Sequence, residues 1–117
     1  MSNRRLSAAL AMLALAGCAA DPAPNEQLRL TEQAVAQAKA VGATEQVPEL
    51  KLAEQKLARA QKNMGEEDYK RARILAEQAE LDARLAEAQV LTQKSRDQLG
   101  ELNTRITRLR KQLGDLQ

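Results

Sequence analysis

The 117-residue chain has no tryptophan, phenylalanine or histidine, and it contains only one tyrosine and one cysteine. Its apolar content therefore comes mostly from alanine and leucine, a profile typical of long helices and coiled coils. Nucleophilic catalysis needs an activated serine, cysteine or lysine beside a base, and zinc or iron sites draw mainly on histidine and cysteine. We therefore expect no enzymatic activity, no metal site and no cofactor.

The N-terminus has the layout of a bacterial secretory leader. Arg4 and Arg5 precede an uncharged run over residues 6–16. This run is about half as long as the roughly 20 apolar residues that a transmembrane helix needs. The pattern therefore predicts a signal peptide over residues 1–17 rather than a membrane span.

The leader runs directly into Cys18, and the residues before this cysteine resemble the bacterial lipobox. The resemblance implies that the signal peptidase recognises Leu15, Ala16 and Gly17. It also implies that Cys18 becomes the first mature residue and carries a covalent lipid with acyl chains such as palmitate, which would anchor the protein firmly. Ala19 rather than Asp follows Cys18, which by the usual sorting rule implies the periplasmic face of the outer membrane. The alternative is an ordinary cleaved leader that leaves Cys18 as a free or intermolecularly paired thiol.

Charge gives no support to a nucleic-acid partner. Without Arg4 and Arg5, which leave with the leader, basic and acidic residues are equal in number. Binding of nucleic acid needs a basic face and usually aromatic stacking groups. We therefore expect no nucleic acid among the partners.

Proline and glycine divide the mature chain into a tether and helices. Two prolines within residues 18–25 favour an extended tether. Asn25 is the expected N-cap of a first helix, and Gly42 is its expected stop. Pro48 fits the first turn of a second helix, which we expect to end at Gly65.

A third helix is expected from Tyr69 onward, because no proline follows and the acidic residues 66–68 can cap its start. Pairs of opposite charge at i and i+4 support the helices, namely Glu66–Lys70, Glu67–Arg71, Glu80–Arg84 and Glu101–Arg105. The predicted fold is all-α: a helical hairpin or three-helix arrangement with a long C-terminal coiled-coil helix.

One face of the third helix carries small side chains at spacings of 3 and 4 residues. We call it the alanine face, and it consists of Ala72, Ala76, Ala79, Ala83 and Ala86. Small side chains let a neighbouring helix approach toward the close end of the usual 8 to 10 Å range. We expect the second helix to pack there in the antiparallel direction.

A second face of the same helix holds the a and d positions of a heptad repeat. This leucine seam consists of Leu99, Leu102, Ile106, Leu109, Leu113 and Leu116, and its frame extends back to Leu81 with interruptions at Thr92 and Ser95. It lies about 150° from the alanine face at 100° per residue. The first two helices can cover only residues 69–90, so we expect the seam to need self-association or an envelope protein partner. The alternative is that the seam packs on the chain's own first helix.

These features divide the chain into four segments. They are the leader (1–17), a lipidated tether (18–25), a helical hairpin region (26–91) and a coiled-coil arm (92–117).

Several features together resemble an uncharacterised family of small Ala-rich helical lipoproteins of Gram-negative bacteria, a domain of unknown function. They are the Leu-Ala-Gly-Cys motif, the proline tether, Pro48-Glu49-Leu50, the turn at 64–69 and the Ala-rich run through Glu87. The resemblance covers most of the mature chain to about Leu91 and implies no catalytic residues. Some members continue into an OmpA-like peptidoglycan-binding domain, which implies a spacer or adaptor role for the helical part.

The chain also resembles the major coiled-coil outer-membrane lipoprotein, which joins the membrane to peptidoglycan through a C-terminal lysine. Here the sequence ends in Gln117 and the nearest lysine is Lys111, so we do not expect covalent attachment by that route.

The sequence thus predicts an outer-membrane-anchored periplasmic lipoprotein that acts as a structural spacer or adaptor through helix–helix contacts. One alternative is an accessory subunit of an envelope transport or assembly complex. Another is noncovalent binding of peptidoglycan by basic residues of the arm, which are Lys94, Arg96, Arg105, Arg108, Arg110 and Lys111.

Overall fold

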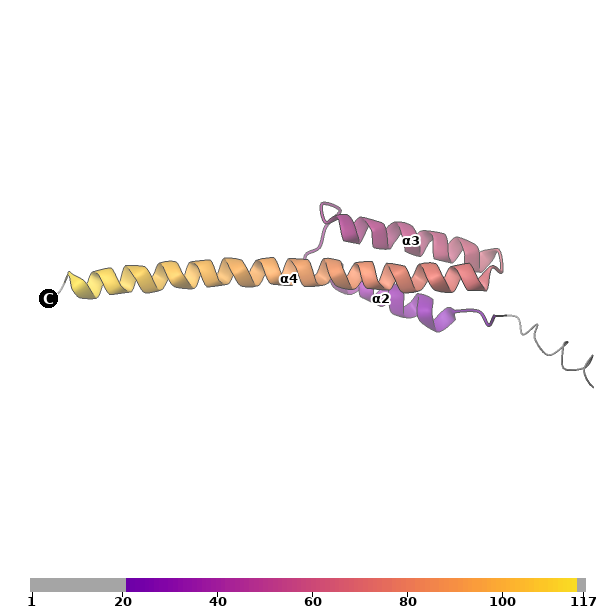
Figure 1. Cartoon of the computed structure of the whole chain (residues 1–117), viewed down its shortest axis with the longest axis horizontal. Helices are drawn as coiled ribbons and strands as arrows, with labels where there is room; N and C mark the ends of the chain where they lie inside the picture. The colour runs from indigo at the N-terminus through magenta and orange to yellow at the C-terminus, as the bar shows by residue number, and fades with distance from the viewer. Residues whose placement is uncertain (1–20, 116–117) are drawn as a thin grey trace, which may run out of the picture.

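The structure is a computed structural model that describes residues 21–115. It contains the helices α2 (Asn25–Ala40), α3 (Pro48–Gly65) and α4 (Tyr69–Gly114), and these residues include no β-strand. Figure 1 shows α2 and α3 packed on one half of α4, whose other half projects as an arm. The predicted all-α class, with a long C-terminal helix, is confirmed. The leader, Cys18 and Leu116 lie outside the described residues.

The helices run alternately along one half of α4. Lys56 of α3 contacts Asp82 of α4, so the two helices form an antiparallel hairpin across a short turn. The α2 helix is parallel to α4: Arg73 donates to the carbonyl of Pro22 just before α2, and Lys94 donates to that of Val41 just after it. The hairpin and α2 therefore form a small three-helix bundle.

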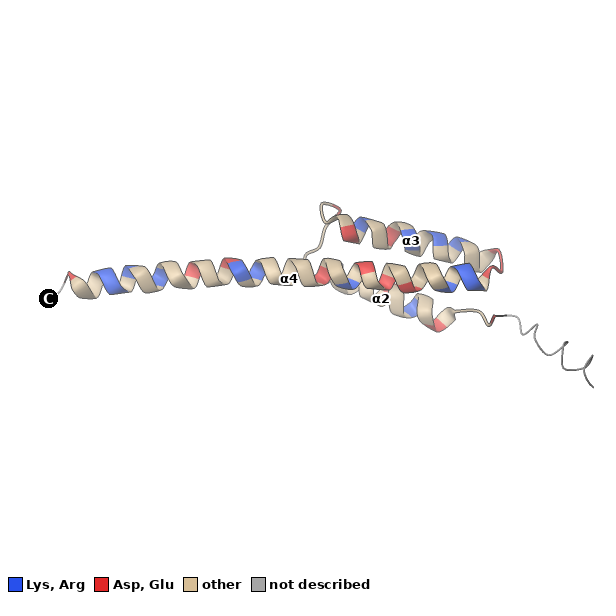
Figure 2. Ribbon diagram, in the orientation of Figure 1, with Lys and Arg blue, Asp and Glu red and all other residues tan. Residues whose placement is uncertain are grey.

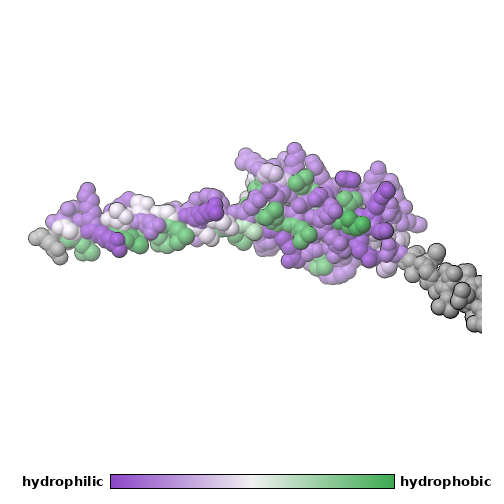
Figure 3. Space-filling view, in the orientation of Figure 1, coloured by the Kyte–Doolittle hydropathy of each residue, from purple (hydrophilic) through white to green (hydrophobic). Residues whose placement is uncertain are grey.

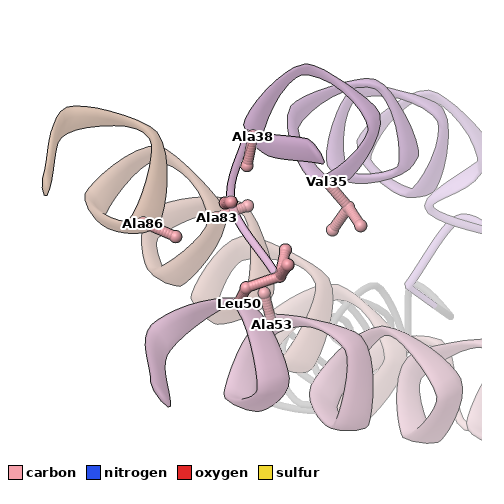
Figure 4. Close-up of a cluster of buried hydrophobic side chains, with 7 residues drawn as sticks. Val35, Ala38, Leu50, Ala53, Ala83 and Ala86 are labelled. Atoms are coloured by element: carbon pink, nitrogen blue, oxygen red, sulfur yellow. The ribbon is translucent and has the colours of Figure 1, made fainter. Parts of the chain in front are cut away.

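The core of this bundle is built mainly from alanine. Among the described residues, nine of the twelve buried hydrophobic side chains are alanines, and the others are Leu28, Val35 and Leu50. Figure 4 shows Leu50 of α3 and Val35 of α2 pointing into the space between these helices, and both belong to the same buried cluster as Ala83 of α4. Because alanine has almost no side chain, the helices are held close together and each larger residue fills much of the remaining space.

Glycine and proline set the helix ends largely as expected. The α2 helix ends before Gly42, which has a positive φ of 104°, and the following amide of Ala43 bonds to the carbonyl of Ala38. Pro48 opens α3, and the Asp68 carboxylate accepts a hydrogen bond from the Arg71 amide at the start of α4.

Two predictions about local structure are wrong. Asn25 is the first helical residue rather than the N-cap, because the amide of Leu28 bonds to the carbonyl of Pro24. Of the four predicted charge pairs only Glu80–Arg84 forms among residues 21–115. Glu66 and Glu67 lie in the turn rather than on α4, so helical spacing does not place them beside Lys70 and Arg71; Glu66 instead pairs with Lys62.

The arm is the continuation of α4 beyond the bundle. Lys94 donates a hydrogen bond to the carbonyl of Val41, just after the end of α2. From Lys94 to Gly114 the helix extends about 30 Å at 1.5 Å per residue. Every described arm residue is exposed. No helix within residues 21–115 has the combined length and hydrophobicity that crossing a membrane requires.

Candidate interaction surface

The leucine seam lies on the free part of α4 and nothing within residues 21–115 covers it. Its five described residues, Leu99, Leu102, Ile106, Leu109 and Leu113, each expose 45 to 65% of their surface. Figure 3 shows hydrophobic residues recurring along one edge of the arm. The alternative expectation, that the seam packs on the first helix, is therefore wrong for these residues, because α2 ends beside Lys94.

The alanine face lies inside the bundle, where all five of its residues are fully buried. It receives two helices rather than the one that the sequence predicts. The α3 helix packs there as expected, and Thr31 of α2 is also buried against it, with its hydroxyl 2.9 Å from the carbonyl of Ala76. The small side chains of the alanine face let α2 approach α4 closely enough for this contact between helices.

The exposed apolar surface continues from the seam onto the bundle half of α4. Ile74, Leu81 and Leu85 are all exposed and fall in the same heptad frame as the seam. Sequence reasoning extended the frame back to Leu81 but missed Ile74, which occupies the d position one heptad earlier. A shallow hollow crosses the frame where the arm leaves the bundle, and its lining includes Leu85, Ala88 and Thr92.

The positions that border the leucine seam on the arm carry only positive charge. With Leu99, Ile106 and Leu113 at a, the e and g positions of the described arm hold three arginines, and the remaining three are uncharged. These arginines are Arg96, Arg105 and Arg110. The arm's carboxylates, on Asp97, Glu101 and Asp115, fall at the outer c and f positions. Figure 2 shows basic and acidic residues distributed along the arm.

The arginines beside the seam are available for a partner. Among residues 21–115 no ion pair involves Arg96, Arg105 or Arg110. The predicted Glu101–Arg105 pair is therefore absent from the described part. The result is an exposed apolar stripe bordered by unpaired positive charge.

Two acidic groups on the bundle half of α4 are instead engaged within the protein. Asp82 lies 2.6 Å from the Lys56 ammonium. The Glu80 carboxylate accepts hydrogen bonds from Gln27 and then Arg84, and these bonds hold its pKa below the ordinary value of 4.5. These contacts hold α2 and α3 against α4.

Within the described range, no group of three or more histidine, cysteine, aspartate or glutamate side chains is arranged to hold a metal ion. The most distinctive surface of the described residues is the apolar leucine seam along α4.

Fold and surface together define a small all-α protein, an alanine-cored helix bundle with a projecting helical arm. The family model described as "Domain of unknown function (DUF4398)" matches residues 26–102, and the chain belongs to that family. No curated protein matches the chain.

A solved structure supports the same architecture. The chain is 70% identical in sequence to a DUF4398 family protein from Pseudomonas aeruginosa PAO1 whose crystal structure is known. The match covers 82% of this chain and all of the other one, with a TM-score of 0.80.

Proposed function

We propose that the protein is a lipid-anchored adaptor of the outer membrane that recognises a partner helix through the leucine seam. The observation that carries this proposal is the exposure of five large apolar side chains in one heptad frame on an arm without a covering helix. Contiguous exposed apolar surface on a soluble domain is typical of a protein interaction site.

The direction of the helices supports a spacer role. Because α2 is parallel to α4, the tether meets the bundle beside Arg73, at the start of α4, while the seam lies near its end (Figure 1). The helix between Arg73 and Leu113, the last described residue of the seam, is about 60 Å long at 1.5 Å per residue. A lipid on Cys18 would thus hold one end at the membrane and leave the seam at the far end.

Fractionation of cells tests the anchor. We expect the protein to stay in the membrane fraction after a high-salt wash and the Cys18→Ser variant to lose this association. If the variant remains in the washed membranes, the lipid anchor is wrong.

The seam is tested by a pair of matched variants. The variant Leu102→Asp with Leu109→Asp should abolish co-purification of envelope partners, because each aspartate would place a charge in the apolar interface. The control is Thr104→Asp with Thr107→Asp, which adds the same charge to the same arm at positions away from the seam. If both variants behave alike, the seam is not the recognition surface.

A second candidate, noncovalent binding of peptidoglycan, rests on the exposed basic groups of the arm. Arg108 and Lys111 join the three flanking arginines, and none of the five forms an ion pair within the described part. Cosedimentation with purified sacculi separates the two candidates. Binding to sacculi should follow these charges rather than the leucines, and it should weaken with salt.

A further inference from the structure

We propose that the arm pairs with a helix of another protein whose apolar a and d positions are bordered by Asp and Glu, rather than with a second copy of this chain. The inference rests on the proposed adaptor function and specifies the chemistry of its partner. The evidence is the charge at the positions that border the leucine seam.

In a coiled coil the e and g residues of one helix lie beside those of its partner and select it by charge. On the described arm these positions are Arg96, Gln98, Asn103, Arg105, Arg110 and Gln112. The arm thus presents three positive charges and no negative one to whatever covers the seam. Carboxylates on the partner are the complementary groups.

A parallel pair of identical chains has the wrong charges. In that arrangement each g residue faces the e residue of the following heptad in the other helix. Arg105 would face Arg110, and on the bundle half Glu77 would face Asp82. Both contacts bring like charges together, and no g–e contact along the exposed frame joins opposite charges.

An antiparallel pair of identical arms is no better. There g faces g and e faces e, so arginine meets arginine or an uncharged side chain at every described position. The bundle half of a second copy also offers little. Glu77 and Asp82 do border its apolar frame, but Asp82 already forms an ion pair with Lys56. The positively charged Arg84 lies on the same flank as Glu77.

The shape of the surface adds a second requirement. Ala88, Thr92 and Ser95 interrupt the row of leucines with smaller side chains, and Ala88 and Thr92 line the shallow hollow at the root of the arm. A partner that extends past the arm onto the bundle would therefore need large apolar side chains at the matching level.

Two synthetic peptides test the charge requirement. Both carry leucine at every a and d position over four heptads; one has glutamate at all e and g positions and the other has lysine. The described bundle and arm lie within residues 21–115, and the solved family member is matched by 82% of this chain. The protein can therefore be used from residue 19 onward, with helicity checked by circular dichroism.

We expect the glutamate peptide to bind at least tenfold more tightly than the lysine peptide at low salt. The variant Arg105→Gln with Arg110→Gln should lose most of this preference. The control variant Arg108→Gln with Lys111→Gln removes the same charge from the same arm at c and f positions, and it should retain the preference.

Four results would overturn the inference. They are equal affinity for the two peptides, binding of neither peptide, equal loss of the preference in the two variants, and a protein dimer that is more stable than the complex with the glutamate peptide. A protein that needs Leu102 and Leu109 for its envelope partners, yet shows no preference between the peptides, would keep the proposed adaptor function and reject only the acidic partner.

Discussion

At the scale of single residues, the bundle depends on side chains that are small. Ala72, Ala76, Ala79, Ala83 and Ala86 are fully buried, and Thr31 reaches the backbone of α4 between them. In such a core an added methyl group has no space, whereas a residue on the opposite side of α4 is free to change. The two faces of one helix should therefore respond in opposite ways to the same substitution.

Ala83→Leu should destabilise the bundle by about 1 to 3 kcal/mol or more, because the larger side chain would push α2 and α3 away from α4. Ala88→Leu is the matched control on the exposed face, and its effect should be within about 0.5 kcal/mol. Urea unfolding followed by circular dichroism measures both. Equal losses would show that the alanine face is not where the helices pack.

Glu80 gives the fold a pH dependence. Hydrogen bonds from Gln27 and Arg84 hold its pKa below 4.5 in the folded protein. A carboxyl group with a lowered pKa stabilises the fold above its unfolded pKa, and this contribution is lost as pH falls through the folded value. Glu80→Gln and Gln27→Leu should each flatten the decline in melting temperature between about pH 5 and about pH 3. An unchanged slope in both variants would rule out this contact as its source.

At the scale of elements, both turns of the bundle use a left-handed residue, but only one is glycine. Gly42 has a φ of 104° and Glu67 a φ of 60°. In each turn the next amide, that of Ala43 or Asp68, bonds back to a carbonyl in the last turn of the preceding helix. This geometry is the usual helix ending in which glycine avoids the strain caused by a Cβ atom.

Glu67→Gly should therefore stabilise the protein by about 0.5 to 1 kcal/mol, and Gly42→Ala should destabilise it by about 1 kcal/mol. A Cβ at Gly42 would lie 3.5 Å from the Lys94 ammonium, an ordinary contact, so the cost comes from the backbone rather than from a clash. Thermal melts of the two variants measure the changes. A loss of stability in Glu67→Gly would contradict the assigned turn.

The helices could be predicted because proline and glycine mark their ends, with Pro48 opening α3 and Gly42 following α2. The role of Glu67 could not, since nothing in its chemistry indicates a positive φ. Periodicity predicted which residues of α4 share a face. It does not show how many helices pack on that face, so the packing of α2 beside α3 was not predicted. The seam was predicted as exposed because the two shorter helices cannot reach it. The signal peptide, the lipid on Cys18 and the location at the outer membrane remain predictions.

At the scale of the whole molecule, stability and recognition are separated along α4. One half is held by α2 and α3, and the other is free, with its apolar residues exposed. Substitutions in the arm should therefore change partner binding with little effect on bundle stability. This separation allows the seam to be tested without unfolding the protein.

The central claim is that the leucine seam contacts another protein in the cell envelope. Its most direct test is a photo-crosslinking amino acid placed in living cells at Leu102 or Leu109, with Thr104 on the outer side of the same arm as the control. We predict adducts of a defined larger mass from the two seam positions and none from Thr104. Adducts to a second copy alone, equal adducts from all three positions, or none from the seam would contradict the account.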